Sequence, residues 1–370
     1  MKKFETILLN EASEIHSEKV LHSEGSTSWI SPSNIAIVKY WGKRPGQIPA
    51  NASLSLTLSK AHTETSVSFS YDRAIKEPRL EFKFEGKPQE QFEKRIKKYI
   101  LEIREFLPWL NHTKLSIDSS NNFPHSSGIA SSASAMSALA LTLCDIEEKM
   151  YGRKTSHDFM KKASFLARLG SGSASRSVYG NMAEWGMTAC RKESSDEYAI
   201  PVTGIHDDLL MLRDSILIIE AGKKKVSSSF GHDLMKSNPY AKLRFEAAEE
   251  NMQRLCSVIT GGDIGQFIDI MENEALSLHA MMMTSSPGFI LMKPNSLKAI
   301  ELIREYRRES GASLGFTLDA GANVHVIYTM KSESKVEKFI DSELKPLCEN
   351  GLVIHDEMGS GPERGVKYDV

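Results

Sequence analysis

The chain has 370 residues, of which 41% are hydrophobic and 25% are charged. This composition is typical of globular proteins, and the length is sufficient for two domains of roughly 150–200 residues each. The formal net charge of −2 shows no basic excess, which argues against DNA or RNA as a partner. A local basic pocket for a phosphorylated metabolite is compatible with this balance.

The cysteines and the N-terminus predict a cytoplasmic protein. The four cysteines are widely spaced and form neither a CxxC pair nor a zinc-ligand pattern, so we expect reduced thiols at Cys144, Cys190, Cys256 and Cys348. The N-terminal apolar stretch ends at Leu9 and contains Glu5, whereas a signal peptide needs roughly 7–15 uninterrupted apolar residues. No apolar run approaches the roughly 18 residues that span a bilayer, so we expect no membrane association.

The first half of the chain is predicted to combine strands with helices. Residues 1–27 are polar and weakly patterned, which predicts an additional helix or a loose arm before the core. A strand interrupted at Pro32 is expected over residues 29–38. Period-two alternation and strand-forming residues predict further strands over 53–58, 63–70, 79–84 and 114–122. Helical spacing predicts helices over 89–106, 131–149 and 155–169.

The second half repeats this mixture without regular βαβ alternation. Strands are predicted over 215–221, 314–318, 323–329 and 351–355. Helices are predicted over 240–259, 263–283, 295–309 and 333–347. The turn-rich stretch 191–208 separates the halves, so we expect an N-terminal extension at 1–27 and α+β domains at 28–203 and 204–370.

The segment PHSSGIASSASA, residues 124–135, has the composition of a phosphate-binding loop. It lies between a predicted strand and a predicted helix, and its small residues let backbone N–H groups approach an anion. The helix start adds unpaired donors and the positive end of its dipole. No Gly-Lys-Ser/Thr follows, so this is not a P-loop. The alternative is a small-residue loop that only packs against the helix.

The segment NIAIVKYWGKR, residues 34–44, places two lysines where a strand gives way to a loop. Lysines at such positions usually face solvent. Lys39, however, directly follows the apolar run IAIV, which predicts that its stem is buried. A buried ammonium requires an anionic partner or loses its charge.

Two further segments carry polar groups suited to chemistry. In LGSGSASRS, residues 169–177, a helix cap at Gly170 would explain the glycine but not Arg176, whose planar fork suits a carboxylate or phosphate. In FTLDAGANVHVIY, residues 316–328, Asp319 stands at the end of one strand before a tight turn. Such a carboxylate is placed for acid–base or electrostatic work, or it only caps its own turn.

Taken together, these segments resemble a known family. The runs NIAIVKYWGK, FPHSSGIASSAS, LGSGSASRS and TLDAGANV are similar, in the same order, to segments of mevalonate diphosphate decarboxylases, which belong to the GHMP kinase superfamily. The resemblance covers about residues 30–330. It implies a GHMP-kinase-like two-domain α+β fold, an active-site cleft between the domains, and a homodimer.

The implied reaction is the ATP-dependent decarboxylation of mevalonate 5-diphosphate to isopentenyl diphosphate. The tertiary 3-hydroxyl is phosphorylated first, and phosphate then leaves as the carboxylate is lost as carbon dioxide. The implied co-substrate is ATP, and Mg²⁺ is carried mainly by its phosphates, with Ser132 as a candidate ligand. The residue spacing itself indicates no protein metal site.

The resemblance also implies roles for individual residues. Asp319 matches the catalytic aspartate that orients or deprotonates the 3-hydroxyl, Lys39 would keep it ionised, and Arg176 would hold the substrate carboxylate. The substrate-binding positions, besides Arg176, are Tyr40, Lys43, Ser171, Gly172, Ser173 and Ser228. The nucleotide-binding positions are Pro124, Ser127, Gly128, Ala130, Ser131, Ser132 and Lys224.

Two positions depart from the family pattern. Ser229 and His232 stand where bacterial members carry arginine and methionine, and the missing arginine is expected to loosen the hold on the 5-diphosphate. His232 either faces solvent or partly replaces that arginine when protonated. In the second case KM for the diphosphate would rise between about pH 6.5 and 8.5.

Three alternatives remain open at this point. A relative could act on mevalonate 5-phosphate, a reading that the absent arginine supports. A mevalonate 3-kinase would stop after phosphorylation, but the joint presence of Asp319, Lys39 and Arg176 argues against it. A non-catalytic nucleotide- or metabolite-binding protein would not need Asp319, and would show no ATP turnover with any mevalonate derivative.

Overall fold

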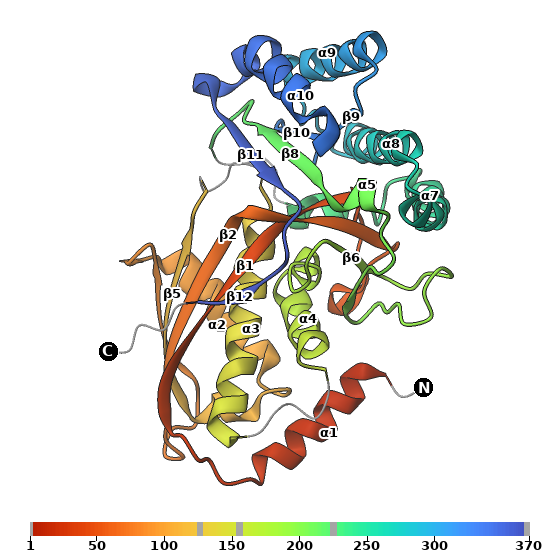
Figure 1. Ribbon diagram of the computed structural model, residues 1–370. Helices are drawn as coiled ribbons and strands as arrows, with labels where there is room; N and C mark the ends of the chain where they lie inside the picture. The colour runs from red at the N-terminus through yellow and green to blue at the C-terminus, as the bar shows by residue number, and fades with distance from the viewer. Residues whose placement is uncertain (1–2, 124–128, 153–157, 223–227, 366–370) are drawn as a thin grey trace.

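The computed structural model describes residues 3–123, 129–152, 158–222 and 228–365. Their strands form two sheets (Figure 1). The larger sheet contains β1 (Glu24–Val38), β2 (Ser53–Tyr71), β3 (Arg79–Phe84), β4 (Lys87–Pro88), β5 (Thr113–Asn121), β6 (Met182–Trp185), β7 (Ala199–Pro201) and β12 (Glu363–Arg364). The smaller sheet contains β8 (Leu212–Leu217), β9 (Leu314–Thr317), β10 (Val324–Thr329) and β11 (Val353–Glu357). The predicted α+β class is confirmed.

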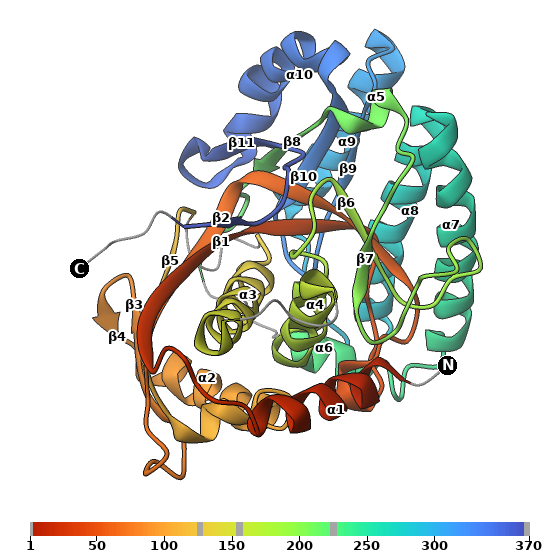
Figure 2. The same ribbon diagram turned by 60° about the horizontal axis from the view of Figure 1, so that its bottom comes forward.

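Helices cover both sheets. Those of the first half are α1 (Phe4–His16), α2 (Glu90–Ile103), α3 (Ser131–Tyr151) and α4 (Phe159–Gly170). Those of the second half are α5 (Asp207–Leu210), α6 (Ser228–Leu234), α7 (Ala241–Gly261), α8 (Ile264–Met283), α9 (Pro294–Ser310) and α10 (Glu333–Phe339). Figure 2 shows α3 and α4 between the arch of β1 and β2 and the layer of α1 and α2. No helix within the described ranges is long and apolar enough to cross a membrane.

The larger sheet is antiparallel except for the β3–β5 pair. Its strand order is β12-β1-β2-β5-β3-β4, with β6 joined to β2 and β7 joined to β6. The smaller sheet is antiparallel throughout, in the order β11-β8-β10-β9. The last strand, β12, returns from the second half of the chain to the edge of the larger sheet beside β1. The two halves are therefore connected by backbone pairing as well as by side chains.

The two central strands are longer than the sequence predicts. Pro32 does not interrupt β1, because the pairing with β2 is irregular between Pro32 and Asn34, where the missing N–H is tolerated. The segments predicted at 53–58 and 63–70 form one strand, β2. At the exposed bend between them, the Asp356 carboxylate accepts the backbone N–H groups of residues 59–61 at 2.7–2.9 Å.

The ends of several other helices and strands differ from the predicted ones, and local sequence patterns explain only some of these differences. The helix predicted at 333–347 is α-helical only to Phe339 and continues as a π-helix and a 3₁₀ turn up to Leu347. Pro346 lies in that last turn and cannot donate a helical hydrogen bond. The strand predicted at 215–221 is shifted to 212–217. The short strands β4, β6, β7 and β12 were not predicted, because two to four residues carry too little periodicity.

The predicted N-terminal extension, residues 1–27, contains the helix α1, which packs into the core, while its last residues already belong to β1. Leu8, Ala12 and Ile15 are buried, and Leu8 belongs to the cluster that includes residues of α2, α3 and α4. Glu11 is also buried and lies 3.9 Å from the Lys162 ammonium, which pairs in turn with Glu147. Of the two forms predicted for this segment, the packed helix is the one observed.

We expect Leu8→Ala to lower the free energy of unfolding by roughly 2–5 kcal/mol, because a fully buried leucine leaves a cavity when truncated. Urea unfolding measures the change. The matched control is Leu21→Ala, where the side chain is 58% exposed and the cost should stay below about 0.5 kcal/mol. Equal, small effects for both variants would show that α1 does not contribute to the folded core.

Candidate active site

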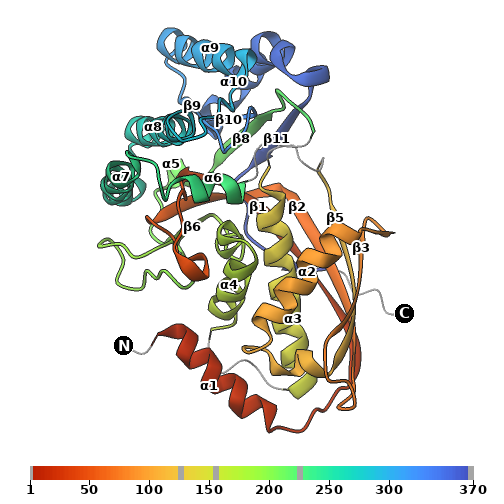
Figure 3. The same cartoon turned by 180° about the vertical axis from the view of Figure 1, so that it is seen from behind.

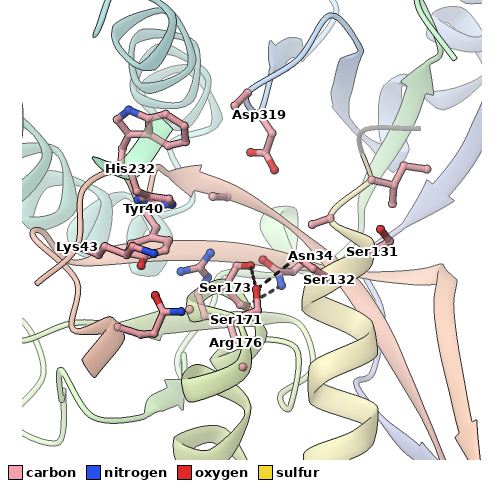
Figure 4. A pocket seen from close by; sticks show the side chains of 18 of the residues that line it. Asn34, Tyr40, Lys43, Ser131, Ser132, Ser171, Ser173, Arg176, His232 and Asp319 are labelled. Atoms are coloured by element: carbon pink, nitrogen blue, oxygen red, sulfur yellow. Dashed lines mark hydrogen bonds between the residues drawn. The ribbon is translucent and has the colours of Figure 1, made fainter. Parts of the chain in front are cut away.

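A cavity of about 810 Å³ lies where the two halves of the chain meet. Its walls come from the end of β1 and the loop after it, from the start of α3, from the segment after α4, from α6, and from the turn between β9 and β10. Figure 4 shows Asp319 on one wall and Arg176, Ser171 and Ser173 on the opposite wall. The segments that sequence reasoning singled out separately thus form one site.

Lys39 and Asp319 form an ion pair at this cavity, and only the lysine is fully buried. The Lys39 ammonium lies 3.1 Å from Oδ1 of Asp319; the lysine side chain is 1% exposed and the aspartate side chain 31% exposed. Lys39 directly follows β1, and its side chain is buried, as predicted. Burial lowers the pKa of Lys39, and the negative charge of Asp319 opposes that shift. The Asp319 carboxylate is therefore partly exposed to the cavity, whereas the Lys39 ammonium is shielded from solvent.

Arg176 is a second buried cation, and it faces the same space. It follows the 3₁₀ turn Gly172–Ser175 and is 2% exposed. Its Nη1 donates to Oγ of Ser53 at 2.6 Å and its Nε donates to Oγ of Ser55, which fixes the plane of the guanidinium. Burial lowers its pKa to about 10, so it stays charged at neutral pH. A desolvated, oriented fork of this kind suits a carboxylate.

The loop after α4 supplies hydroxyl groups and one obligatory glycine. Oγ of Ser171 lies 3.5 Å from Oγ of Ser173 and 3.4 Å from Oγ of Ser132, at the start of α3. A Cβ on Gly172 would lie 2.8 Å from the ring and the hydroxyl of Tyr40. Gly172 is thus required for Tyr40 to reach the cavity, where burial raises the pKa of its phenol.

The start of α3 lies at the wall of the cavity. Ala130, Ser131 and Ser132 line the cavity, and α3 begins at Ser131 without a side-chain cap. The helix N-terminus is therefore available to an anion such as a phosphate. Pro124, Ser127 and Gly128, which were predicted to bind nucleotide, lie outside the described residues, as does Lys224. Ser228 begins α6, and its side chain and that of Ser229 lie outside the description.

The structure contradicts the predicted role of His232. Its side chain is buried between the rings of Tyr40 and Trp41, and its Nδ1 accepts the backbone N–H of Gly42 at 2.9 Å. Burial, with a contribution from Lys43, lowers the pKa of His232 to about 3. A side chain that is 7% exposed does not face solvent, and a neutral imidazole cannot replace a missing arginine, so the structure contradicts both expected states of His232. It therefore gives no basis for a His232-dependent change of KM between about pH 6.5 and 8.5. The sequence analysis did not foresee that His232 packs against two aromatic rings.

Several lining residues were not predicted. Asn34 donates from Nδ2 to the backbone oxygen of Ser173 at 3.2 Å and to Oγ of Ser177 at 2.7 Å, and so ties β1 to the loop that carries Arg176. Its signal in the sequence is a polar side chain beside the apolar run IAIV. The far end of the cavity is lined by residues of β3, α2 and the turn between them, namely Phe84, Gln89, Gln91, Phe92 and Arg95.

This combination of features defines a class of protein. A helix N-terminus, two buried cations and one ionisable carboxylate meet in a cavity between two α+β units, which suits the binding and reaction of phosphorylated small molecules. Within the described ranges, no cluster of three metal-ligating side chains is present. The two buried cations and the helix N-terminus make this a site suited to anions.

Comparisons with known proteins identify the family. Residues 31–197 match the diphosphomevalonate decarboxylase-like N-terminal domain, and residues 215–363 match the mevalonate 5-diphosphate decarboxylase C-terminal domain. The chain is 32% identical to a diphosphomevalonate decarboxylase of Aspergillus fumigatus over 86% of this chain and 80% of the relative. It is 29% identical to the enzyme of Eremothecium gossypii over 85% and 80%, respectively.

Solved structures agree with this relationship. The mevalonate diphosphate decarboxylase of Staphylococcus aureus superposes with a TM-score of 0.79 at 30% identity, covering 93% of this chain and all of that one. A structure of MDDEF in complex with MVAPP, AMPPCP and magnesium gives a TM-score of 0.77 at 29% identity, with the same coverage. The chain belongs to the diphosphomevalonate decarboxylase family, and its fold is that of the GHMP kinases.

The neutral state of His232 predicts a pH dependence of stability. Because its pKa is lowered from 6.5 to about 3, the unfolded chain gains a proton below pH 6.5 that the folded chain does not. The contribution of the neutral His232 to the free energy of unfolding is fully present above pH 6.5. It is lost as the pH falls toward about 3, the pKa of His232 in the folded state. Between pH 7 and pH 5 this one group should cost about 2 kcal/mol.

We therefore expect His232→Phe to lose less stability than the wild type between pH 7 and pH 5, by about that amount. Urea unfolding at both pH values measures the difference. The matched control is His206→Phe, which removes a histidine whose side chain is 43% exposed and so separates the effect of the buried His232 from that of losing any histidine. An unchanged pH dependence in His232→Phe would contradict the neutral, buried state.

Proposed function

We propose that this enzyme catalyses the ATP-dependent decarboxylation of mevalonate 5-diphosphate to isopentenyl diphosphate. Family membership supports the reaction, and the relative solved with MVAPP, AMPPCP and magnesium supports the substrates. The single observation that carries the proposal is the Lys39–Asp319 ion pair facing Arg176 across the cavity. These are the charged groups that phosphorylation of a hydroxyl and loss of a nearby carboxylate require.

The reaction has two parts. The 3-hydroxyl oxygen attacks the γ-phosphorus of ATP, the bond between that phosphorus and the bridging oxygen breaks, and ADP leaves. Next the C3–O bond breaks with release of phosphate, while the electron pair of the C1–C2 bond forms the C2–C3 double bond and carbon dioxide departs. The protein must orient the hydroxyl, hold the carboxylate plane and stabilise positive charge at C3.

Each described group has a place in that scheme. Asp319 orients the 3-hydroxyl and accepts its proton, and its negative charge favours the developing cation at C3. Lys39 holds the carboxylate in place, so the ion pair acts as one unit. Arg176 binds the substrate carboxylate through the N–H groups that Ser53 and Ser55 leave available. The 5-diphosphate is bound by side chains and backbone of Tyr40, Lys43, Ser171, Gly172, Ser173 and Ser228.

ATP binds with its phosphates at the N-terminus of α3, where Ala130, Ser131 and Ser132 lie. Magnesium fits this site, because one carboxylate and serine hydroxyls suit an ion that keeps its waters and phosphate ligands. Ser132 and the ATP phosphates would hold it, and it would neutralise charge on the transferring phosphoryl group. We also propose a cytoplasmic homodimer with domains at 28–203 and 204–370 after the extension 1–27, which light scattering and limited proteolysis can examine.

The substrate is tested by a coupled ADP-release assay with carbon dioxide measured alongside. Mevalonate, its 5-phosphate and its 5-diphosphate are compared at equal concentration. We expect the 5-diphosphate to give the highest kcat/KM, with one carbon dioxide for each ADP. A higher kcat/KM for the 5-phosphate would overturn the substrate, and ADP without carbon dioxide would overturn the decarboxylation.

We expect Asp319→Asn to lower kcat and kcat/KM together by roughly 10³-fold or more, because the charge acts mainly in the transition state. Substrate binding, measured by calorimetry, should change only a few-fold. The matched control is Asp233→Asn, an exposed carboxylate on α6 that pairs with Lys236 and should leave turnover unchanged. If Asp319→Asn kept a tenth of wild-type turnover, Asp319 would not be the catalytic carboxylate.

A further inference from the structure

Helix α8 is hydrogen-bonded to both residues of the ion pair, Lys39 and Asp319. Glu274 and His279 lie on this helix, and each is 1% exposed. Oε2 of Glu274 accepts the backbone N–H of Lys39 at 2.9 Å. Nε2 of His279 lies 3.1 Å from the backbone oxygen of Asp319, and since a carbonyl oxygen only accepts, Nε2 carries the proton. Figure 3 shows α8 beside β9 and β10, on whose connecting turn Asp319 lies.

Glu274 is held in place by a buried network of hydrogen bonds. Besides the Lys39 N–H, its carboxylate accepts Nη2 of Arg244 at 2.7 Å and Nδ2 of Asn251 at 2.8 Å, both from α7. Nε and Nη1 of Arg244 are buried without a hydrogen-bond partner among the described residues. An apolar cluster would fill the same space at lower cost, since buried ion pairs often stabilise less than apolar residues do. A contribution to the stability of the fold therefore does not explain why this network is present.

His279 is suited to a donor role that does not change with pH. Burial lowers its pKa to about 4, so the ring is neutral throughout the neutral range. A neutral ring donates one hydrogen bond from Nε2 and adds no third cation next to Lys39 and Arg176. The hydrogen bond to the Asp319 carbonyl therefore fixes the turn without altering the charge of the site.

We propose that Glu274 and His279 are positioning residues that hold the backbones of Lys39 and Asp319 at the separation the catalytic ion pair requires. The two partners are 280 residues apart in the sequence, and one helix hydrogen-bonds to both. Neither side chain needs to touch substrate for this role. The proposal rests on the proposed function for its kinetic part only.

The main test compares two variants of His279. His279→Leu removes the donor at similar size, whereas His279→Gln keeps an N–H donor. We expect His279→Leu to lower kcat roughly 10–100-fold, because a misplacement of about 1 Å can cost that much, while KM for both substrates stays within about threefold. His279→Gln should recover most of the loss. The matched control is Asn273→Ala, at an exposed position of the same helix, which should behave as wild type.

The crystal structures of both variants give a measurement independent of activity. In His279→Leu the contact between the Lys39 ammonium and the Asp319 carboxylate should open beyond about 4 Å, the limit for an ion pair, and in His279→Gln it should persist. A leucine variant with wild-type kcat and an intact contact would overturn the proposal. So would a loss of kcat with the contact intact, or a rise of KM alone.

Glu274 is tested by replacing all three side chains of its network together. The triple variant Glu274→Leu, Arg244→Met and Asn251→Leu leaves no unpaired side-chain charge or amide and should still unfold in one cooperative transition. We expect its kcat to fall roughly tenfold or more with KM little changed, and full kcat would overturn the role of Glu274. A wild-type enzyme that releases no carbon dioxide from mevalonate 5-diphosphate would refute the proposed function, and the variant crystal structures would then decide the positioning proposal.

Discussion

The structure depends on the cost of burying the Lys39 ammonium. A lysine with 1% of its side chain exposed cannot remain charged unless an anion lies within a few ångströms, and Asp319 is that anion. Lys39 directly follows β1 of the larger sheet, and Asp319 follows β9 of the smaller sheet. The ion pair therefore requires the two halves of the chain to meet at one place, which is where the cavity lies.

The same charge balance explains the chemistry. Lys39 and Arg176 outnumber Asp319 among the charged groups of the ion pair and the guanidinium facing it, so this part of the cavity attracts anions. In the proposed reaction the Asp319 carboxylate would stabilise the positive charge that develops at C3. Both cations are desolvated, and the arginine is oriented by two serine hydroxyls before any substrate arrives. Because little reorganisation is left for the reaction itself, positioning is the main contribution that the protein makes. In the positioning proposal, the buried Glu274 and His279 of α8 hold the backbones of Lys39 and Asp319 in the same way.

The features that could be predicted from the sequence are those that depend on residues close together in the chain. The apolar run before Lys39 indicated a buried lysine, the small-residue stretch after residue 123 indicated a helix start facing an anion, and the long amphipathic helices were placed within a few residues. Features that depend on residues far apart in the sequence were not predicted. The bend of β2 needs Asp356, nearly 300 residues away, and the neutral state of His232 needs the rings of Tyr40 and Trp41. Glu274 and His279 were missed because nothing local distinguishes them from other polar residues of an amphipathic helix.

The central claim is that Lys39 and Asp319 act as one catalytic unit, and a double-mutant cycle in kcat/KM tests it most directly. The cycle compares Lys39→Met, Asp319→Asn and the double variant with mevalonate 5-diphosphate and ATP. We predict that the double variant is little worse than either single variant, so that the coupling energy exceeds about 2 kcal/mol. Additive losses, in which the double variant shows the product of the two single effects, would contradict the claim.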